Sequence, residues 1–132
     1  MFDRGTLTEA ELIERWETRM GRPQSELSAI IDAVRESLDV KPDTLRLVQA
    51  LRQRGTELFC LSNMPNSVYV HLRRRHGFWD AFKGIVISGQ IQMMKPEPEV
   101  FAHLLDKFAL RAEETVFIDD APANIEGAKR VS

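Results

Sequence analysis

Three short apolar runs, separated by helical patterns, most constrain what this chain can fold into. Residues 56–61, 85–87 and 115–118 have the length of strands and are mainly apolar instead of alternating between apolar and polar. Strands of this kind are buried on both faces, which is typical of a parallel sheet covered by helices. Because helical patterns follow each run from Pro42 onward, the sequence predicts an α/β fold with a parallel sheet.

The first part of the chain has a purely helical pattern. Thr8 with Glu11 three residues later forms a capping box, and Pro23 can begin a second helix. We therefore expect a small helical cap over residues 1–41 and an α/β core over residues 42–132. No strand pattern precedes the cap or follows the last helical pattern, so we expect the chain to be truncated at both ends. Further helices are predicted over residues 45–51, 65–75, 100–108 and 122–131.

Composition narrows the class of protein. The 132 residues, 43% of them hydrophobic, suffice for one domain or a domain with a small accessory lobe. No apolar stretch approaches the ~20 residues of a membrane helix. No signal peptide is apparent and the one cysteine excludes an internal disulfide, so we expect a cytoplasmic protein. The net charge of −2 does not suggest a nucleic-acid partner, although residues 41–95 carry an excess of basic side chains that could attract an anion. The oligomeric state stays open.

Polar residues follow two of the predicted strands and occupy a turn between them. Ser62 follows the first strand, Asp119 and Asp120 end the third, and Lys95 precedes a proline. Ligands of open parallel sheets bind beyond the carboxyl ends of the strands, so folding would bring these residues together. A hydroxyl and a lysine can bind phosphate oxygens, and carboxylates suit Mg²⁺. The pattern predicts a Mg²⁺-dependent site for a phosphorylated metabolite.

Each feature alone also has an ordinary structural explanation. Ser62 could be a loop hydroxyl, Lys95 could lie in a solvated turn, and Asp120 could cap the helix that follows it. Their order along the chain, with each at a strand end or in the loop beyond, favours a shared site over coincidence.

With these motifs in order, the chain resembles the haloacid dehalogenase-like (HAD-like) hydrolase superfamily, in the branch with a small helical cap and a Rossmann-like core. Ser62 matches the second motif of that family, Lys95 in the stretch MKPEPEVF the third, and Asp119-Asp120 in FIDDAPANIEGA the fourth. The last stretch is similar to sugar-phosphate phosphatases, including glucose-1-phosphate phosphatase-like enzymes. The acidic pair fits phosphatases better than dehalogenases, which need no metal.

The resemblance implies a role for each matched residue. Ser62 and Asn63 would bind the transferring phosphoryl group, and Lys95 would steady the charges of phosphate and nucleophile. Asp120 would be the direct ligand of Mg²⁺. Asp119 would hold a metal-bound water or pair with Lys95.

The chain departs from the family at the first motif, a strand followed by Asp-x-Asp whose first aspartate attacks phosphorus. No Asp-x-Asp occurs in the 132 residues. Asp3 lies in a segment that imitates the motif superficially but resembles the start of the first cap helix. We therefore expect a fragment that is nearly inactive alone, because covalent catalysis needs its nucleophile.

Three other interpretations remain open. The protein could bind phosphate or a sugar phosphate without catalysis, it could be a metal-independent 2-haloacid dehalogenase, or it could be a structural or interaction module. Cys60 is expected to pack inside the first strand, and the three histidines lack the spacing of metal ligands.

Overall fold

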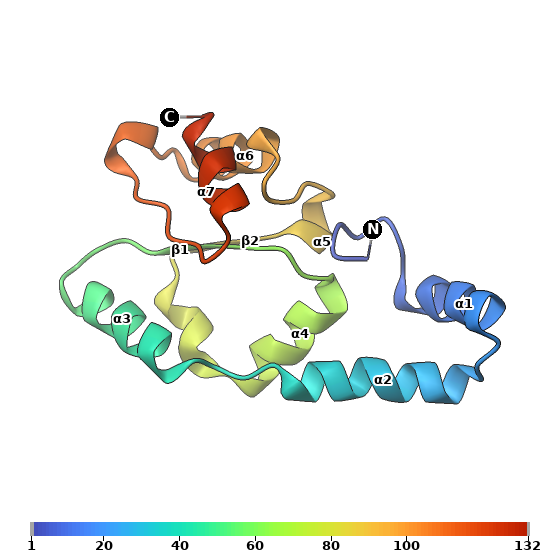
Figure 1. The fold of residues 1–132 in the computed structure, drawn as a ribbon. Coiled ribbons are helices and arrows are strands. Elements are labelled where there is room, and N and C mark those ends of the chain that lie inside the picture. The colour runs from blue at the N-terminus through green and yellow to red at the C-terminus, as the bar shows by residue number, and fades with distance from the viewer. Residues whose placement is uncertain (1, 132) are drawn as a thin grey trace.

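The computed structural model describes residues 2–131 and shows a small parallel sheet with helices on both faces (Figure 1). Helices α6 and α7 lie on one side of the sheet, and α3 and α4 lie on the other. The elements in chain order are α1 (Glu9–Met20), α2 (Gln24–Ser37), α3 (Pro42–Gln53), β1 (Phe59–Ser62), α4 (Asn66–Arg75), the 3₁₀ helix η1 (Gly77–Ala81), β2 (Gly84–Ile87), α5 (Ser88–Ile91), α6 (Pro98–Phe108), the 3₁₀ helix η2 (Ala112–Glu114) and α7 (Pro122–Lys129).

The sheet confirms the expected α/β fold. Strands β1 and β2 pair in parallel, with Phe59 opposite Gly84 and Ser62 opposite Ile87. The first strand begins three residues later than predicted and extends to Ser62. Because both strands run in the same direction, their carboxyl ends lie at one edge of the sheet, where Ser62 is the last residue of β1.

The helical hairpin at the start of the chain also forms as its sequence signals predict. Thr8 accepts a hydrogen bond from the Glu11 N–H while the Glu11 carboxylate accepts from the Thr8 N–H, so the capping box is complete. Helix α2 packs beside α1 through the buried Leu27 and Ile31. The boundary between cap and core at residues 41 and 42 stays a prediction.

The third predicted strand is wrong. Residues 115–119 belong to no helix or strand within residues 2–131. Side chains there still alternate: Phe117 packs edge-to-face on Phe101 with ring centroids 5.1 Å apart, while Val116 and Ile118 are 85% and 68% exposed. The apolar pattern is therefore not sufficient for a strand, because a strand also needs a neighbour to share its ladder of hydrogen bonds.

The exposed apolar side chains of residues 115–119 lead to a prediction about self-association. Exposed apolar edges recruit other chains, so we expect the purified protein to be dimeric or larger. The double substitution Val116→Lys/Ile118→Lys should shift it toward monomer, with a dissociation constant raised by roughly tenfold or more, about 1.4 kcal/mol. Sedimentation velocity across a concentration series measures this change. Leu47→Lys is the matched control, because Leu47 is also exposed but lies on α3. A wild-type chain that stays monomeric throughout would contradict the prediction.

The core lies between the sheet and helices α6 and α7 (Figure 1). Val86 of β2 and Val100 and Phe101 of α6 form its buried centre, with Leu61 and Phe117 packed against them. This packing holds β1 against α6, and the site described below is built from residues at the end of β1 and in the loops before α6 and α7. Among residues 2–131, no helix is both long and apolar enough to cross a bilayer.

Candidate functional site

A buried ion pair lies at the centre of the candidate site. Lys95 Nζ lies 2.5 Å from Asp119 Oδ2, and the two side chains are only 12% and 7% exposed. The ammonium group also lies 5.7 Å from the centroid of the Phe117 ring. Lys95 comes from the loop between α5 and α6, and Asp119 comes from the segment before α7. The fold thus brings together two of the residues singled out in the sequence.

Asp119 is held by three donors. Its Oδ1 accepts hydrogen bonds from the Ala121 N–H and from Asn124 Nδ2, each at 2.9 Å, while Oδ2 faces Lys95. Burial opposes ionisation of this carboxyl, but the hydrogen bonds from Lys95, Ala121 and Asn124 outweigh it and lower the pKa of Asp119 below its usual value. Asp119 is therefore a carboxylate at neutral pH and keeps Lys95 in place.

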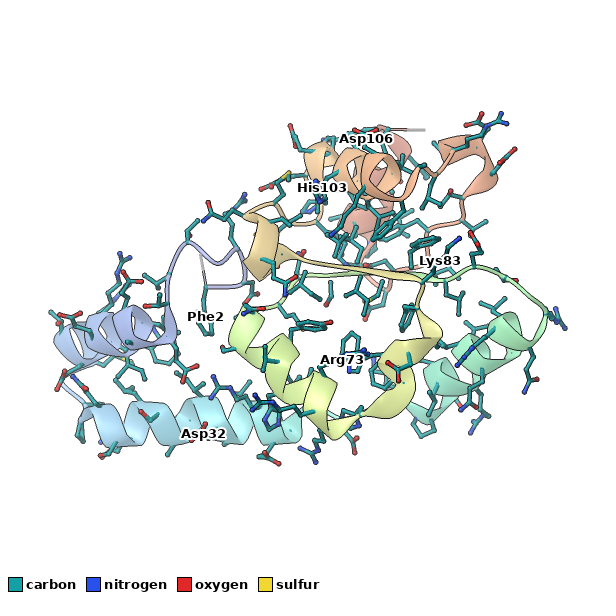
Figure 2. All side chains as sticks on the ribbon, turned by 180° about the vertical axis from the view of Figure 1, so that it is seen from behind. Phe2, Asp32, Arg73, Lys83, His103 and Asp106 are labelled. Atoms are coloured by element: carbon teal, nitrogen blue, oxygen red, sulfur yellow. The ribbon has the colours of Figure 1, made fainter. Side chains whose placement is uncertain are left out.

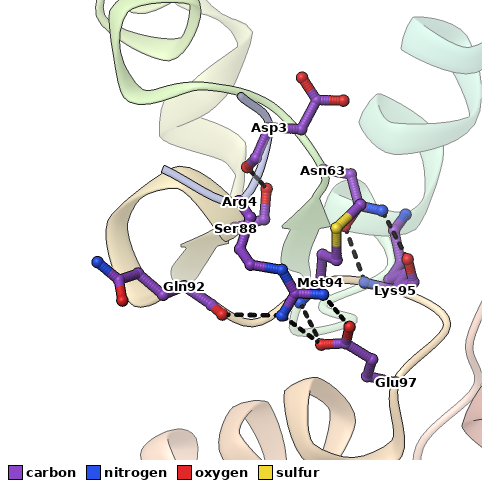
Figure 3. Close-up of polar contacts among 8 residues, drawn as sticks. All are labelled: Asp3, Arg4, Asn63, Ser88, Gln92, Met94, Lys95 and Glu97. Atoms are coloured by element: carbon purple, nitrogen blue, oxygen red, sulfur yellow. Dashed lines mark hydrogen bonds and ion pairs between the residues drawn. The ribbon is translucent and has the colours of Figure 1, made fainter. Parts of the chain in front are cut away.

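Asn63 holds the backbone of Lys95 from the end of β1 (Figure 3). Its Nδ2 donates to the Lys95 carbonyl at 2.8 Å, and its Oδ1 accepts from the Lys95 N–H at 2.9 Å. Both functional atoms of the amide are thus engaged by one residue. The family resemblance implied that Asn63 binds the phosphoryl group, and that role stays a prediction; in the structure its side chain bonds the backbone of Lys95.

Ser62 and Asp120 are the two site residues whose side chains stay available. Ser62 is half-buried at the carboxyl end of β1, and Asp120 is exposed beside Asp119. In the described part of the chain, neither side chain has a hydrogen-bond or ion-pair partner. The alternative explanation of Asp120 as a helix cap is wrong, because α7 has Ala121 at its N-cap and no side-chain capping bond.

The acidic pair at residues 119 and 120 is the candidate for a metal site. Within residues 2–131, no group of three or more His, Cys, Asp or Glu side chains is arranged to hold a metal ion. Mg²⁺ does not need such a cage, because it is usually bound by one or two carboxylates together with substrate phosphate and water. The free carboxylate of Asp120 fits that requirement, whereas Asp119 is already occupied by Lys95.

A second set of contacts ties the start of the chain to the Lys95 loop. Arg4 makes a paired contact with the Glu97 carboxylate and donates to the Gln92 carbonyl at 3.1 Å. Glu97 in turn accepts from the Met94 N–H at 3.2 Å. No local signal in the sequence could have revealed this support, because Arg4 and Glu97 are 93 positions apart.

The segment that imitates the missing motif packs against α5. The Asp3 carbonyl accepts a hydrogen bond from the fully buried Ser88, whose hydroxyl also accepts from the Met64 N–H at 3.0 Å. Asp3 itself is exposed. Gly5 has a φ of 75° and approaches the Gly89 carbonyl so closely that a Cβ atom would collide with it. Through these contacts, residues 3–5 hold the start of the chain against α5.

The other reactive side chains do not join the site. Burial raises the pKa of the Cys60 thiol to about 11, and nearby Lys95 lowers it only partly, so the thiol is neutral at pH 7. An open groove between α2 and α4, lined in part by Arg35, His71 and Arg74, shares no residue with the site. Figure 2 shows Asp32 and Arg73 on these two helices, apart from His103 on α6.

Comparison with known proteins places this geometry in a family. A family model described as haloacid dehalogenase-like hydrolase matches residues 4–132. The sesquiterpene phosphatase astK of Aspergillus oryzae is 29% identical over 130 residues, which are 98% of this chain and 66% of that protein. A phosphoglycolate phosphatase of Rhodospirillum rubrum is 29% identical over 90 residues, 68% of this chain and 37% of that protein.

Solved structures agree with the fold. A HAD family enzyme of Bacteroides thetaiotaomicron, an aspartate-to-alanine mutant in complex with magnesium and inorganic phosphate, superimposes with a TM-score of 0.81 at 25% sequence identity. The match covers 98% of this chain and 69% of that one. The chain thus spans 66% of the Aspergillus oryzae phosphatase, 37% of the Rhodospirillum rubrum phosphatase and 69% of the Bacteroides thetaiotaomicron enzyme.

Proposed function

The chain belongs to the haloacid dehalogenase-like hydrolase family, and from that premise we propose that it carries the phosphate- and metal-binding half of a phosphatase for small phosphate monoesters. The observation that supports this most is the Lys95–Asp119 pair, which Asn63 connects to the carboxyl end of β1, where Ser62 is the last residue. Phosphoryl transfer depends on positioning and on charge stabilisation more than on covalent chemistry by the protein, and this arrangement offers both.

Each residue has a role in binding the phosphoryl group. Ser62 donates a hydrogen bond from its hydroxyl to one phosphoryl oxygen, and the backbone N–H of Asn63, directly after β1, approaches the same group. Lys95 adds a fixed positive charge, because Asp119 and Asn63 hold it in place. Asp120 keeps an exposed carboxylate for a metal ion. Bound Mg²⁺ would neutralise phosphate charge at this carboxylate, as it does generally in phosphoryl transfer.

The nucleophile is the part that the 132 residues do not supply. In the family, an aspartate attacks phosphorus and forms an aspartyl-phosphate, which water then hydrolyses. The chain has no Asp-x-Asp, so we propose that the complete activity needs a segment carrying that motif. Without it, the chain binds phosphate and releases it unchanged.

Two measurements on the 132-residue chain test the proposal. We expect saturable binding of inorganic phosphate that strengthens with Mg²⁺, and no hydrolysis of p-nitrophenyl phosphate above background. Metal-dependent turnover that Asp120→Asn abolishes would show that a nucleophile is present after all. Failure to bind phosphate at any Mg²⁺ concentration would refute the phosphate site.

A polypeptide extended by a strand that ends in Asp-x-Asp separates the competing interpretations. Hydrolysis that EDTA abolishes supports the phosphatase. Phosphate binding without hydrolysis supports a non-catalytic binding protein. Cleavage of 2-haloacids that persists in EDTA supports a dehalogenase.

A further inference from the structure

The double hydrogen bond between Asn63 and Lys95 assigns a role to Asn63. We propose that Asn63 is a positioning residue, which fixes the peptide of Lys95 so that its ammonium group points at the phosphate position, and that the Asn63 amide is not itself a phosphate ligand. The proposal rests on the proposed phosphate-binding function and specifies how one residue serves it.

The geometry leaves the amide little to offer a ligand. An asparagine side chain presents one carbonyl oxygen and one NH₂ group. In this structure the oxygen accepts from the Lys95 N–H at 2.9 Å and the nitrogen donates to the Lys95 carbonyl at 2.8 Å. Nδ2 could bind phosphate and keep its bond to Lys95 only if its second hydrogen pointed at the ligand. Oδ1 is a hydrogen-bond acceptor like the phosphate oxygens, so it cannot bind them.

Asn63 is well placed to transmit rigidity. It directly follows Ser62, the last residue of β1, whose register against β2 is fixed by the parallel ladder. Lys95 lies in an irregular loop that the sheet itself does not hold. The amide therefore connects the end of a hydrogen-bonded strand to a loop outside the sheet.

The remaining contacts of the loop act on neighbouring residues. The Glu97 carboxylate accepts a hydrogen bond from the Met94 N–H, and Arg4 donates one to the Gln92 carbonyl (Figure 3). Among the contacts described for residues 2–131, the backbone of Lys95 is bonded by Asn63. Asp119 then holds the far end of the same side chain. Lysine loses much rotational freedom when its side chain is fixed, so holding both ends before binding reduces the cost of ordering it for phosphate.

A double-mutant cycle tests the proposal with inorganic phosphate and Mg²⁺ as the probe. Binding is measured by calorimetry for the wild type, Asn63→Ala, Lys95→Met and the double variant. We expect Asn63→Ala to weaken binding roughly tenfold when Lys95 is present and to have almost no further effect when Lys95 is absent. Equal weakening in both backgrounds would mean that Asn63 touches phosphate directly, and would overturn the proposal.

Two further variants serve as controls for the double-mutant cycle. Asn66→Ala removes an asparagine that bonds Gln90 instead of Lys95, and it should leave phosphate affinity unchanged. If Lys95→Met fails to fold, the cycle is run in Lys95→Met/Asp119→Asn, where position 119 no longer carries a charge without its partner. A tenfold loss in Asn66→Ala would point to general loosening of this edge and count against a specific role of Asn63.

A measurement without ligand separates this proposal from the proposed function. Hydrogen exchange of the Lys95 backbone amide, observed by NMR on lysine-labelled protein, should become at least tenfold faster in Asn63→Ala and stay unchanged in Asn66→Ala. If the wild type binds no phosphate, the proposed function fails while the exchange result still decides whether Asn63 fixes the Lys95 peptide. Unchanged exchange in Asn63→Ala would overturn the positioning role.

Discussion

Replacing Lys95 by methionine is expected to lower the free energy of unfolding by about 3 kcal/mol, the low end of the range for breaking a buried ion pair. The reason is that Asp119, with a side chain only 7% exposed, would keep its charge without its cationic partner. Affinity for inorganic phosphate should fall at least tenfold in the same variant, because the fixed positive charge is lost. Urea denaturation at pH 7 measures the first effect and calorimetry the second.

The pH dependence of the unfolding free energy gives a second, independent test of the Lys95–Asp119 pair. The pKa of Asp119 is lower in the folded chain than its usual value. A carboxyl of this kind stabilises the fold above its unfolded pKa, and that contribution is lost as the pH falls through the folded pKa. In Lys95→Met the hydrogen bond and charge of the lysine no longer oppose burial, so the pKa of Asp119 should be higher than in the wild type. The stability difference between wild type and variant should therefore be largest near pH 7 and shrink in acid.

The matched control is Lys129→Met. Lys129 also pairs with an acidic residue, Glu126 at 2.8 Å, but both side chains are more than 60% exposed. Its loss should leave stability and phosphate affinity almost unchanged, since exposed pairs contribute little. Lys95→Met that unfolds at the same urea concentration as the wild type would show that the pair is not a buried structural contact.

The two neighbouring aspartates should respond in opposite ways to the same substitution. Asp120→Asn is expected to abolish the strengthening of phosphate binding by Mg²⁺, a loss of at least tenfold, while the unfolding free energy changes by no more than about 0.5 kcal/mol. The reason is that Asp120 is exposed and unpartnered among residues 2–131, so removing its charge should affect metal binding and not the fold. Asp119→Asn should instead destabilise the fold, because it removes the partner of Lys95.

Titration of phosphate affinity against Mg²⁺, followed by urea denaturation of both variants, measures this contrast. Asp120→Glu provides the control, since it keeps a carboxylate at the same place and should retain part of the Mg²⁺ effect. An Asp120→Asn variant with a full Mg²⁺ response would remove Asp120 from the metal site. Equal destabilisation by both substitutions would mean that the two carboxylates share one structural role.

The sequence by itself determined the features that depend on short-range interactions. The capping box at Thr8 and Glu11 places the start of α1, since each partner lies within one turn of the other. The apolar runs of β1 and β2 identify a parallel pair of strands, although β1 is only half-buried. Ser62, Lys95 and Asp119 could be singled out because each follows a predicted strand or occupies a loop between two predicted strands, and such positions meet at one edge of a sheet.

Only the tertiary structure decided which of these groups bind one another. The apolar run at residues 115–118 looks like the other strands, but strand pairing needs a neighbour along its length, and the described chain places none there. Asn63 could have faced a ligand or the protein, and its two bonds to Lys95 across 32 positions settle its contacts. Local pattern encodes backbone conformation and burial, whereas hydrogen-bond partners far apart in the chain are set by how the elements pack.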